Sequence, residues 1–555
     1  MKKTFFALLL LTGSFLGKAE NYVSKVWVSD NGNGTYKNPI LYADYSDPDV
    51  IRVGDDFYLT ASSFNCIPGL PILHSKDLVN WKMINYALPE LRMEGIEPVD
   101  FFDNPQHGRG VWAPCIRYHN DEFYIYWGDP DFGIYVVKTK DISGKWEKPV
   151  LVKAGKGLID PSPLFDDDGR IYLVHAYAGS RAGLNSILTV CELNERGTKV
   201  LGNESIVFDG NDGVNHTVEG GKFYKRDGFY YILAPAGGVA TGWQLALRSK
   251  NVYGPYDAKR VLAQGNSEIN GPHQGALVDT QNGENWFVHF QDKGAYGRIV
   301  HLQPVKWEDG FPVMGMNDNN YCGEPVLTYQ KPNVGKIYPV ETPQASDEFN
   351  SEKLGLQWQW HANPQQTWAF PSANGYLRLY GQYYPDNYIN MWQVPNLLLQ
   401  KLFAPEFTAT AKISATLLND GDKVGFVIMG WDYAYVSLEK SGKEYILKQS
   451  ICKDAEQKNA EEIVAKIPLN TLKIDKKLNY KTPIDEAQIY FRLEIKNGAI
   501  CTFSYSADGK NFTNLSQTFK AREGKWIGAK TGFFIMNKEK NTSRSWADID
   551  WFRIN

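Results

Sequence analysis

The stretch "DYSDPDVIRVGDDFYLTAS", residues 44–62, places a run of aspartates directly before a short apolar segment. A Gly-Asp-Asp turn and a second segment rich in aromatic residues follow, which is the pattern of a β-hairpin with a buried first strand. Burial removes water from a carboxylate and makes its ionised form costly, so an acid at the edge of a core indicates a function that needs it. The stretch therefore raises the question of why Asp47 stands there.

The same pattern occurs four more times: a polar or small residue, a short apolar strand, a turn rich in Asp, Asn and Gly, and an aromatic strand. The four segments are "APCIRYHNDEFYIYWG" from residue 113, "DPSPLFDDDGRIYLVHA" from residue 160, "EGGKFYKRDGFYYILAP" from residue 219 and "HQGALVDTQNGENWFVHF" from residue 273. Their spacing is roughly fifty residues, as for blades of a β-propeller. The repeats predict an all-β chain with a five-bladed β-propeller over residues 30–330.

In a propeller, the innermost strand of each blade lines a central channel, so residues in the same register converge near one mouth. That register is occupied by Asp47, Ala113, Asp160, Glu219 and His273. Three carboxylates and one imidazole are therefore expected to meet in one pocket. Like charges crowded in a partly dry pocket raise some pKa values and separate an acid from a base. Two carboxyl groups facing each other, with a third to orient the acid, are the equipment for glycoside hydrolysis.

A second domain is predicted after a Pro-containing linker at residues 329–344. From there the sequence alternates between apolar and polar residues in strands such as "FTATAKISATL", "VGFVIMGW" and "CTFSYSADGKNF". Their spacing predicts a jelly-roll-like β-sandwich over residues 345–555. Such a domain could bind sugar independently, but we favour packing support for the propeller, because sheets readily bury a face against a neighbour.

Composition excludes several classes of function. The net charge is -4, with acids and bases interspersed, so there is no basic stripe for nucleic acid. Six cysteines are scattered without a CxxC or CxxH cluster, which argues against zinc and favours buried apolar roles. Nucleotide-binding loops and the HExxH and GxSxG motifs are missing from the sequence, so the chemistry is expected to come from carboxylates, with no required cofactor.

The N-terminus, "MKKTFFALLLLTGSFLGKAENY", has the pattern of an export signal. Two lysines precede an apolar run that is short for a membrane span, and Gly17-Lys18-Ala19 provides small residues for cleavage. We expect residues 1–19 to be removed, leaving a periplasmic or secreted protein without a membrane anchor.

Several of these motifs, taken together, resemble a known protein family. The stretches "SDPDVIRVGDDFYLTASSF", "HSKDLVNWKMINYAL", "GVWAPCIRYHNDEFYIYWG", "LIDPSPLFDDDGRIYLVHAY" and "VEGGKFYKRDGFYYI" resemble glycoside hydrolase family 43, in their joint order, over Ile40 to Gly315. The resemblance implies a five-bladed propeller that acts with inversion, mostly as a β-xylosidase, an α-L-arabinofuranosidase or an arabinanase. The second domain is similar to the C-terminal sandwich of many exo-acting members, which in those relatives can lend a loop to the rim of the active site.

By position, the resemblance implies Asp47 as general base, Glu219 as general acid and Asp160 as the residue that modulates the pKa of the acid and orients it. His273 matches a channel histidine that in some members lies beside a bound calcium ion; the other interpretation is a histidine that is simply hydrogen-bonded inside the channel. No cofactor is required, and a structural calcium ion beside His273 is the one metal that the resemblance suggests.

Three further residues are candidates for substrate binding. Arg298 matches a pocket arginine that contacts sugar hydroxyls, although an arginine paired with a pocket acid would look the same in sequence. Phe64 and Trp112 could form the apolar wall of the sugar subsite or pack between blades. Asn65 and Cys66 stand where better-known xylosidases have an acidic and an aromatic residue, so substrate preference cannot be copied from them.

The leading hypothesis is an inverting exo-glycosidase that releases α-L-arabinofuranose from plant cell-wall oligosaccharides, namely fragments of xyloglucan, arabinoxylan or arabinan. The alternative is a β-D-xylosidase or an enzyme with both activities. A retaining fructan hydrolase, with reacting carboxyls about 5 to 5.5 Å apart in place of roughly 6.5 to 9.5 Å, is a more distant alternative. A sugar-binding protein without catalysis is the third.

Overall fold

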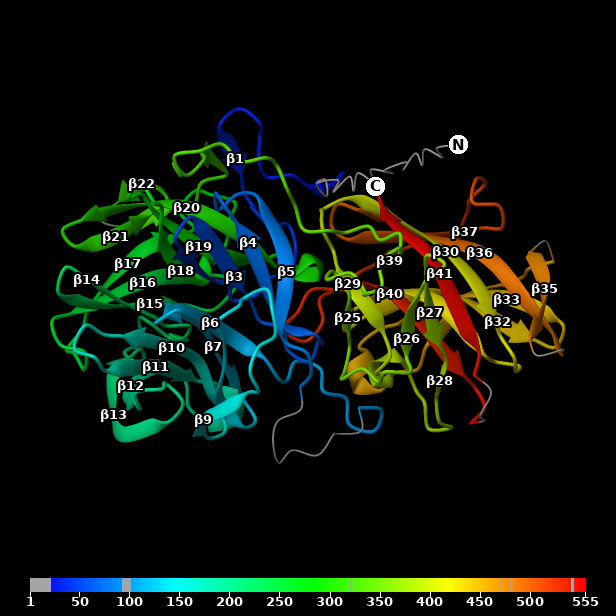
Figure 1. Ribbon diagram of the computed structural model, residues 1–555, viewed down its shortest axis with the longest axis horizontal. Coiled ribbons are helices and arrows are strands. Elements are labelled where there is room, and N and C mark those ends of the chain that lie inside the picture. Colours follow the sequence, from blue (N-terminus) through cyan, green and yellow to red (C-terminus); the bar gives the residue numbers. More distant parts are fainter. Residues whose placement is uncertain (1–20, 92–100, 320–321, 471, 480–481, 541–543) are drawn as a thin grey trace, which may run out of the picture.

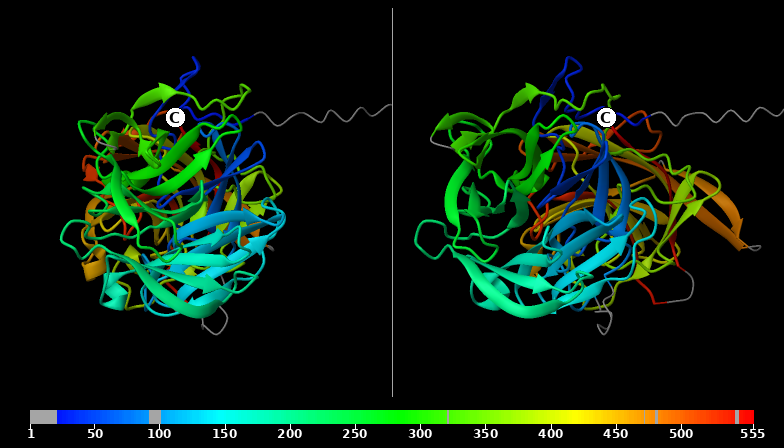
Figure 2. Two further views of the ribbon diagram at one scale, coloured as in Figure 1. Left: turned by 90° about the vertical axis from the view of Figure 1, so that its left-hand side faces the viewer. Right: turned by 60° about the vertical axis from the view of Figure 1, so that its left-hand side comes forward.

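The structure is a computed structural model that describes residues 21–555 apart from 92–100, 320–321, 471, 480–481 and 541–543. Two β-domains lie side by side along the long axis, the first coloured blue to green and the second yellow to red (Figure 1). Seen from the end of the first domain, its strands stand in front of the second domain (Figure 2). The predicted fold class, a propeller followed by a sandwich, is confirmed.

The first domain contains five antiparallel sheets, each built from four consecutive strands. The first two blades are β2 (Asp49–Val53), β3 (Asp56–Thr60), β4 (Gly69–Ser75) and β5 (Trp81–Leu88), and β6 (Trp112–His119), β7 (Glu122–Asp129), β8 (Gly133–Thr139) and β9 (Val150–Ala154). The third is β10 (Leu158–Phe165), β11 (Ile171–Tyr177), β12 (Ile187–Leu193) and β13 (Val200–Asp209). The last two are β14 (Lys222–Arg226), β15 (Phe229–Ala236), β16 (Trp243–Ser249) and β17 (Asp257–Ala263), and β18 (His273–Asp279), β19 (Asn285–Asp292), β20 (Arg298–Glu308) and β21 (Phe311–Met314).

Short strands complete and close the propeller. The strands β22 (Met316–Asn319) and β23 (Cys322–Glu324) extend the fourth blade, and β1 (Thr35–Lys37) pairs with β24 (Thr328–Gln330). Leu41 bridges to Val300 of β20, which ties the segment before the first blade to the fifth blade. The described helical segments are α1 (Gly179–Ala182), η1 (Gly294–Tyr296), η2 (Met391–Gln393) and η3 (Ala455–Gln457).

The predicted hairpin turns follow from local backbone chemistry. Residue pairs 120–121, 227–228 and 309–310 join β6 to β7, β14 to β15 and β20 to β21, and both residues of each pair have positive φ. Two successive positive φ values define the type I′ turn, whose twist matches that of the flanking strands, and Asn, Asp and Gly tolerate this conformation best. The Asn-Asp and Asp-Gly pairs of the sequence therefore set the hairpins.

The second domain is a sandwich of two sheets. One follows the order β25-β29-β40-β31-β32-β33-β34, with β28 beside β40, and the other β26-β27-β41-β30-β36-β37-β38, with β35 and β39 at its side. The first sheet contains β25 (Gln359–Trp360), β28 (Gln382–Tyr383), β29 (Leu398–Lys401), β31 (Lys423–Met429), β32 (Tyr433–Ser441), β33 (Glu444–Cys452), β34 (Glu462–Pro468) and β40 (Lys530–Asn537). The second contains β26 (Ala369–Ser372), β27 (Tyr376–Tyr380), β30 (Phe407–Thr416), β35 (Lys473–Asn479), β36 (Thr482–Lys496), β37 (Ile500–Ser506), β38 (Thr513–Asn514), β39 (Phe519–Lys520) and β41 (Trp546–Ile554).

The domains are joined by direct backbone pairing. Ile67 and Trp360 exchange two hydrogen bonds of 2.9 and 2.6 Å, and the Ala529 amide donates to the Ala295 carbonyl at 2.7 Å. One apolar core runs from the first and fifth blades into the sandwich. Burying a large apolar side chain contributes about 1.5 to 3 kcal/mol, so this continuous core holds the domains together, as the packing interpretation predicted.

Three further sequence predictions concern the export signal, a membrane anchor and the cysteines. The export signal lies in residues 1–20, which are outside the described residues. No helix in the described part of the chain is long and apolar enough to cross a membrane. Five of the six cysteines are free and buried, namely Cys66, Cys115, Cys191, Cys452 and Cys501.

Candidate active site

The inner strands of all five blades share one unusual backbone position at the mouth of the channel. In the first four blades the backbone adopts positive φ two residues before the first regular pair of the inner strand, and in the fifth blade it does so one residue before that pair. The residues are Asp47 (φ 54°), Ala113 (35°), Asp160 (56°), Gly220 (60°) and Gln274 (35°). Such a conformation is costly for residues other than glycine, and strained backbone is found where function requires a side chain to be aimed.

This position corrects the sequence prediction for two blades. Glu219 and His273 were placed in the same register as Asp47, but the structure puts Gly220 and Gln274 there, one residue later. A Cβ atom at position 220 would lie 2.7 Å from the Gln274 side chain, so this slot requires glycine. The acid of the fourth blade therefore comes from the preceding residue, Glu219.

Asp47 is held by donors on all sides. It is buried, and its Oδ2 accepts hydrogen bonds from the hydroxyls of Ser46 and Ser62 at 2.7 and 2.6 Å. Its Oδ1 accepts from the Arg298 guanidinium at 2.9 Å. Ser62 also accepts the amide of Ala113 at 2.7 Å, which fixes the serine between the first two blades. These three hydrogen bonds fix the position of the Asp47 carboxyl group, as a general base that must orient a water molecule requires.

Glu219 is in the opposite situation. It is partly buried, and its carboxyl group has no hydrogen-bond donor among the residues that the structure describes. Burial raises the pKa of Glu219 to about 8, and the charges of Asp160 and Asp47 add to the rise, while Arg298 opposes it. The group is therefore protonated near neutral pH and able to donate.

Asp160 shares one feature with each of these residues: it accepts a hydrogen bond, as Asp47 does, and burial raises its pKa, as for Glu219. Its Oδ2 accepts the amide of Gly220 at 2.7 Å, so it is attached to the strand that carries Glu219. Burial raises the pKa of Asp160 to about 6, with a further contribution from Asp47, while the Gly220 amide and the buried Lys222 ammonium oppose it. Above this pH, its negative charge keeps the proton on Glu219. The three predicted carboxylates therefore influence one another electrostatically, with separate roles set by their surroundings.

Arg298 pairs with a pocket acid and also keeps donors that could contact a sugar, so it fits both interpretations of the sequence. Its guanidinium donates to Asp47 and, at 2.6 Å, to the Ser46 hydroxyl, and it stacks over Phe290 with 4.8 Å between the guanidinium carbon and the ring centroid. Both hydrogen bonds use one terminal nitrogen, Nη1. The rest of the fork leaves donors that sugar hydroxyls could use.

The aromatic residues form a wall that spans the two domains. Phe64 is fully buried and packs edge-on against the partly buried Trp112, with ring centroids 6.1 Å apart. Trp112 in turn contacts Trp526, with centroids 5.8 Å apart, and Ile527 packs with Phe64. Trp526 and Ile527 belong to residues 521–529 of the sandwich, between β39 and β40, and Trp526 is 45% exposed. Phe64 is thus a packing residue, whereas Trp112 and Trp526 present aromatic surface.

His273 is buried, and neither of its ring nitrogens has a hydrogen-bond partner within the described chain. Burial lowers the pKa of His273 to about 3, and the nearby Arg298 charge adds to the effect, so the ring is neutral. Calcium takes six to eight oxygen ligands, and the described residues contain no group of three or more His, Cys, Asp or Glu side chains that could hold a metal ion. A calcium ion beside His273 therefore stays a prediction, and no step of the chemistry is routed through it.

Three contributors were missed by the sequence reasoning. Ser62 lies inside the opening stretch, but hydroxyls are too common to stand out. Trp526 comes from the other domain, more than four hundred residues away, where no repeat relates it to the pocket. Asp44 lies in the opening run of acids, but it has no counterpart in the other blades.

Comparison with known proteins agrees with this geometry. The pattern of "Glycosyl hydrolases family 43" matches residues 36–312, and that of the "Beta xylosidase C-terminal Concanavalin A-like domain" matches residues 346–555. A Xylanibacter ruminicola protein assigned by name to the β-xylosidases is 36% identical over 92% of this chain and 88% of its own length. The non-reducing end α-L-arabinofuranosidase of Bacteroides ovatus is 30% identical over 93% of this chain and 94% of its own length.

Among solved structures, a bifunctional GH43-CE protein of Bacteroides eggerthii is 28% identical with a TM-score of 0.77. The match covers 94% of this chain, and the chain spans 63% of that protein. Family patterns, relatives and architecture agree over both domains. The chain therefore belongs to glycoside hydrolase family 43, whose enzymes hydrolyse glycosidic bonds.

Proposed function

We propose that the protein is an inverting exo-glycosidase that releases one β-D-xylose at a time from the non-reducing end of its substrate. The observation that carries the proposal is the contrast between Asp47, whose carboxyl group is fixed by three hydrogen-bond donors, and Glu219, whose raised pKa keeps its proton. Asp47 takes a proton from water as the water oxygen bonds to the anomeric carbon. Glu219 gives its proton to the leaving oxygen as the glycosidic bond breaks.

The choice of xylose departs from the first sequence hypothesis. The 36% identical Xylanibacter relative is assigned by name to the β-xylosidases, which supports xylose at least as well as arabinofuranose. Release of α-L-arabinofuranose remains the second candidate, because the 30% identical relative from Bacteroides ovatus is an α-L-arabinofuranosidase. An enzyme with both activities fits both relatives.

The substrate class and the cellular location are further parts of the proposal. Exo action is supported by the loop at residues 521–529 of the sandwich, which packs against Trp112 and Phe64 of the propeller. The oligosaccharides of plant cell walls carry the terminal pentoses that such a pocket would take. The N-terminal export pattern supports a periplasmic location for the mature protein, and N-terminal sequencing of the mature protein tests for cleavage after Ala19.

The test is hydrolysis of 4-nitrophenyl β-D-xylopyranoside and 4-nitrophenyl α-L-arabinofuranoside by the mature protein. Faster turnover of the xyloside, with xylose and xylobiose as first products from xylotriose, supports the proposal. Faster turnover of the arabinofuranoside supports the second candidate instead. No turnover of either sugar contradicts both.

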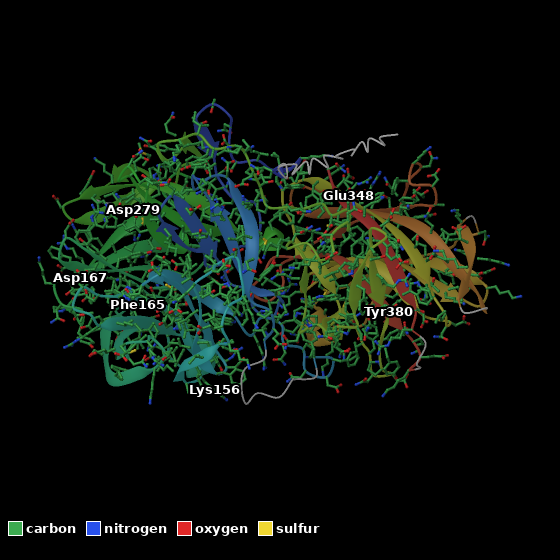
Figure 3. The ribbon with its side chains drawn as sticks, in the orientation of Figure 1. Lys156, Phe165, Asp167, Asp279, Glu348 and Tyr380 are labelled. Atoms are coloured by element: carbon green, nitrogen blue, oxygen red, sulfur yellow. The ribbon has the colours of Figure 1, made fainter. Side chains whose placement is uncertain are left out.

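A matched control shows whether a loss of activity is specific to Asp47 or follows from the removal of any acidic charge. Asp47→Asn should abolish turnover, whereas Asp167→Asn should leave it unchanged. The Asp167 side chain is 88% exposed and lies on the outer side of the propeller, away from the sandwich (Figure 3). Equal activity in all three proteins would exclude Asp47 as the base.

A further inference from the structure

One carboxylate outside the catalytic set touches both the active site and the sandwich. Asp44 is buried, and its Oδ1 accepts the backbone amide of Arg298 at 2.9 Å. Its Oδ2 accepts the backbone amide of Gly528 at 3.0 Å. Arg298 is the residue that holds Asp47, and Gly528 lies two residues after Trp526. A single side chain therefore joins the arginine at the base to the sandwich loop at the rim.

The backbone around Asp44 is built for this close approach. A Cβ atom at Gly297 would lie 2.5 Å from the Asp44 carboxyl carbon, and one at Gly528 would lie 2.7 Å from the Gly297 nitrogen. Contacts below 3.0 Å are not tolerated, so both positions require glycine. The Tyr45 amide also donates to the Arg298 carbonyl at 3.1 Å. Residues 44 and 45 thus hold Arg298 by its amide and its carbonyl.

The charge of Asp44 is matched from the sandwich side. Lys401 of β29 and Lys530 of β40 are buried cross-strand neighbours. Burial lowers the pKa of Lys401 to about 8, and Lys530 adds to the effect, while Asp44 opposes it. Lys401 lies over the Tyr45 ring, with its ammonium 4.9 Å from the centroid, and Lys530 donates to Gln359 at 2.9 Å. Lys401 is therefore a buried amine of the sandwich on which the charge of Asp44 acts.

We infer that Asp44 is a positioning residue: it fixes Arg298 against Asp47 and, with the same carboxylate, holds the sandwich loop 521–529 at the rim. The inference rests on the proposed function for the role of Asp47, but the hydrogen bonds of Asp44 do not depend on it. Loss of Asp44 should loosen the loop and the arginine together. The sandwich is in this way part of the catalytic assembly as well as a support.

The first test compares Asp44→Asn with the parent enzyme on 4-nitrophenyl β-D-xylopyranoside from pH 4 to 9. The amide keeps the shape of the side chain and loses its charge. We expect kcat/KM to fall roughly ten-fold, because misplacement of a group that contacts the base is costly. The fall should lie more in kcat than in KM, because Arg298 positions the base that acts on water. The ionisable groups around Asp44 are Arg298, Asp47, Tyr45, Lys401 and Lys530.

The matched control is Asp347→Asn. Asp347 is also buried and also accepts three kinds of donor, namely the Phe349 amide and the Gln357 and Trp358 side chains, but it lies in the sandwich away from the mouth. Its substitution should cost stability without lowering the kcat of the folded protein. If Asp44→Asn lowers stability and leaves kcat at the parent value, as the control does, the inference is wrong.

The second test needs no turnover. Amide hydrogen exchange of the full chain should increase at Arg298 and at Gly528 together in Asp44→Asn, and at neither residue in Asp347→Asn. Unchanged exchange at these two amides overturns the inference whatever the activity. Absence of hydrolysis by the parent protein, with the exchange result as expected, would contradict the proposed function and leave the positioning role standing.

Discussion

Two partly buried glutamates, one in each domain, show how surroundings decide the role of a carboxyl group. Glu461, between η3 and β34, accepts hydrogen bonds from the hydroxyls of Tyr388, Tyr433 and Tyr435 at 2.8, 2.7 and 2.9 Å. The buried Lys423 donates to Tyr435 at 3.2 Å. Glu219, in the propeller, has carboxylates for neighbours and no donor among the described residues.

A carboxylate whose hydrogen-bonding capacity is satisfied stabilises structure, whereas a carboxyl group without donors, among like charges, is available for chemistry. Glu461 attaches Tyr388, which precedes η2, to β32 through one group. Glu219 gains nothing for stability from its position, because burial and two negative neighbours disfavour its ionised form. Substitutions of Glu219, Glu461 and Asp160 test this difference between the two glutamates.

The largest effect is expected from Glu219→Gln. Removing the acid should lower kcat on xylobiose roughly a thousand-fold, or about 4 kcal/mol, because the sugar leaving group needs a proton. The loss on 4-nitrophenyl β-D-xylopyranoside should be much smaller, because nitrophenolate leaves without one. Steady-state kinetics on both substrates measure the ratio. Equal losses on the two would show that Glu219 does not protonate the leaving group.

The next effect concerns stability and not turnover. Glu461→Leu should destabilise the sandwich by about 3 kcal/mol, because three buried hydroxyls and Lys423 lose their common partner. Urea unfolding monitored by tryptophan fluorescence measures this, with Glu461→Gln, which keeps one acceptor oxygen, as the milder control. The kcat of the folded protein should stay at the parent value. A reduced kcat with normal stability would break the contrast, since Glu461 would then act in catalysis.

The third effect is on pH dependence. In the parent, kcat/KM should fall as pH drops through about 6, where Asp160 gains a proton, and as pH rises through about 8, where Glu219 loses one. Asp160→Asn removes a negative neighbour of Glu219, so the alkaline limb should move down by about one pH unit. The same variant should lower kcat/KM roughly a hundred-fold, or about 2.7 kcal/mol. An alkaline limb that stays near pH 8 would show that Asp160 does not tune the acid.

Most of the fold could be predicted because local residue patterns determine its strands and turns. Turns rich in Asp, Asn and Gly and apolar inner strands recur in each blade, so the five hairpins could be predicted without any contact information. Asp47 and Asp160 were found for the same reason, since both occupy the positive-φ position of their blades.

The remaining features depend on contacts that a repeat does not encode. The one-residue offset of Glu219 arises because Gln274 of the next blade fills the space beside Gly220. Trp526 and Asp44 act across the domain boundary, where packing and not periodicity brings them together. The sugar itself could not be predicted, because xylopyranose and arabinofuranose offer similar hydroxyls to one arginine and an aromatic wall.

The central claim is that Asp47 activates water and does not attack the sugar. The most direct measurement is proton NMR of the anomeric signals during the first minutes of hydrolysis of 4-nitrophenyl β-D-xylopyranoside. The account predicts that α-xylose appears first and that β-xylose follows only by mutarotation. Initial appearance of β-xylose would mean retention, which would make Asp47 a nucleophile and contradict the account.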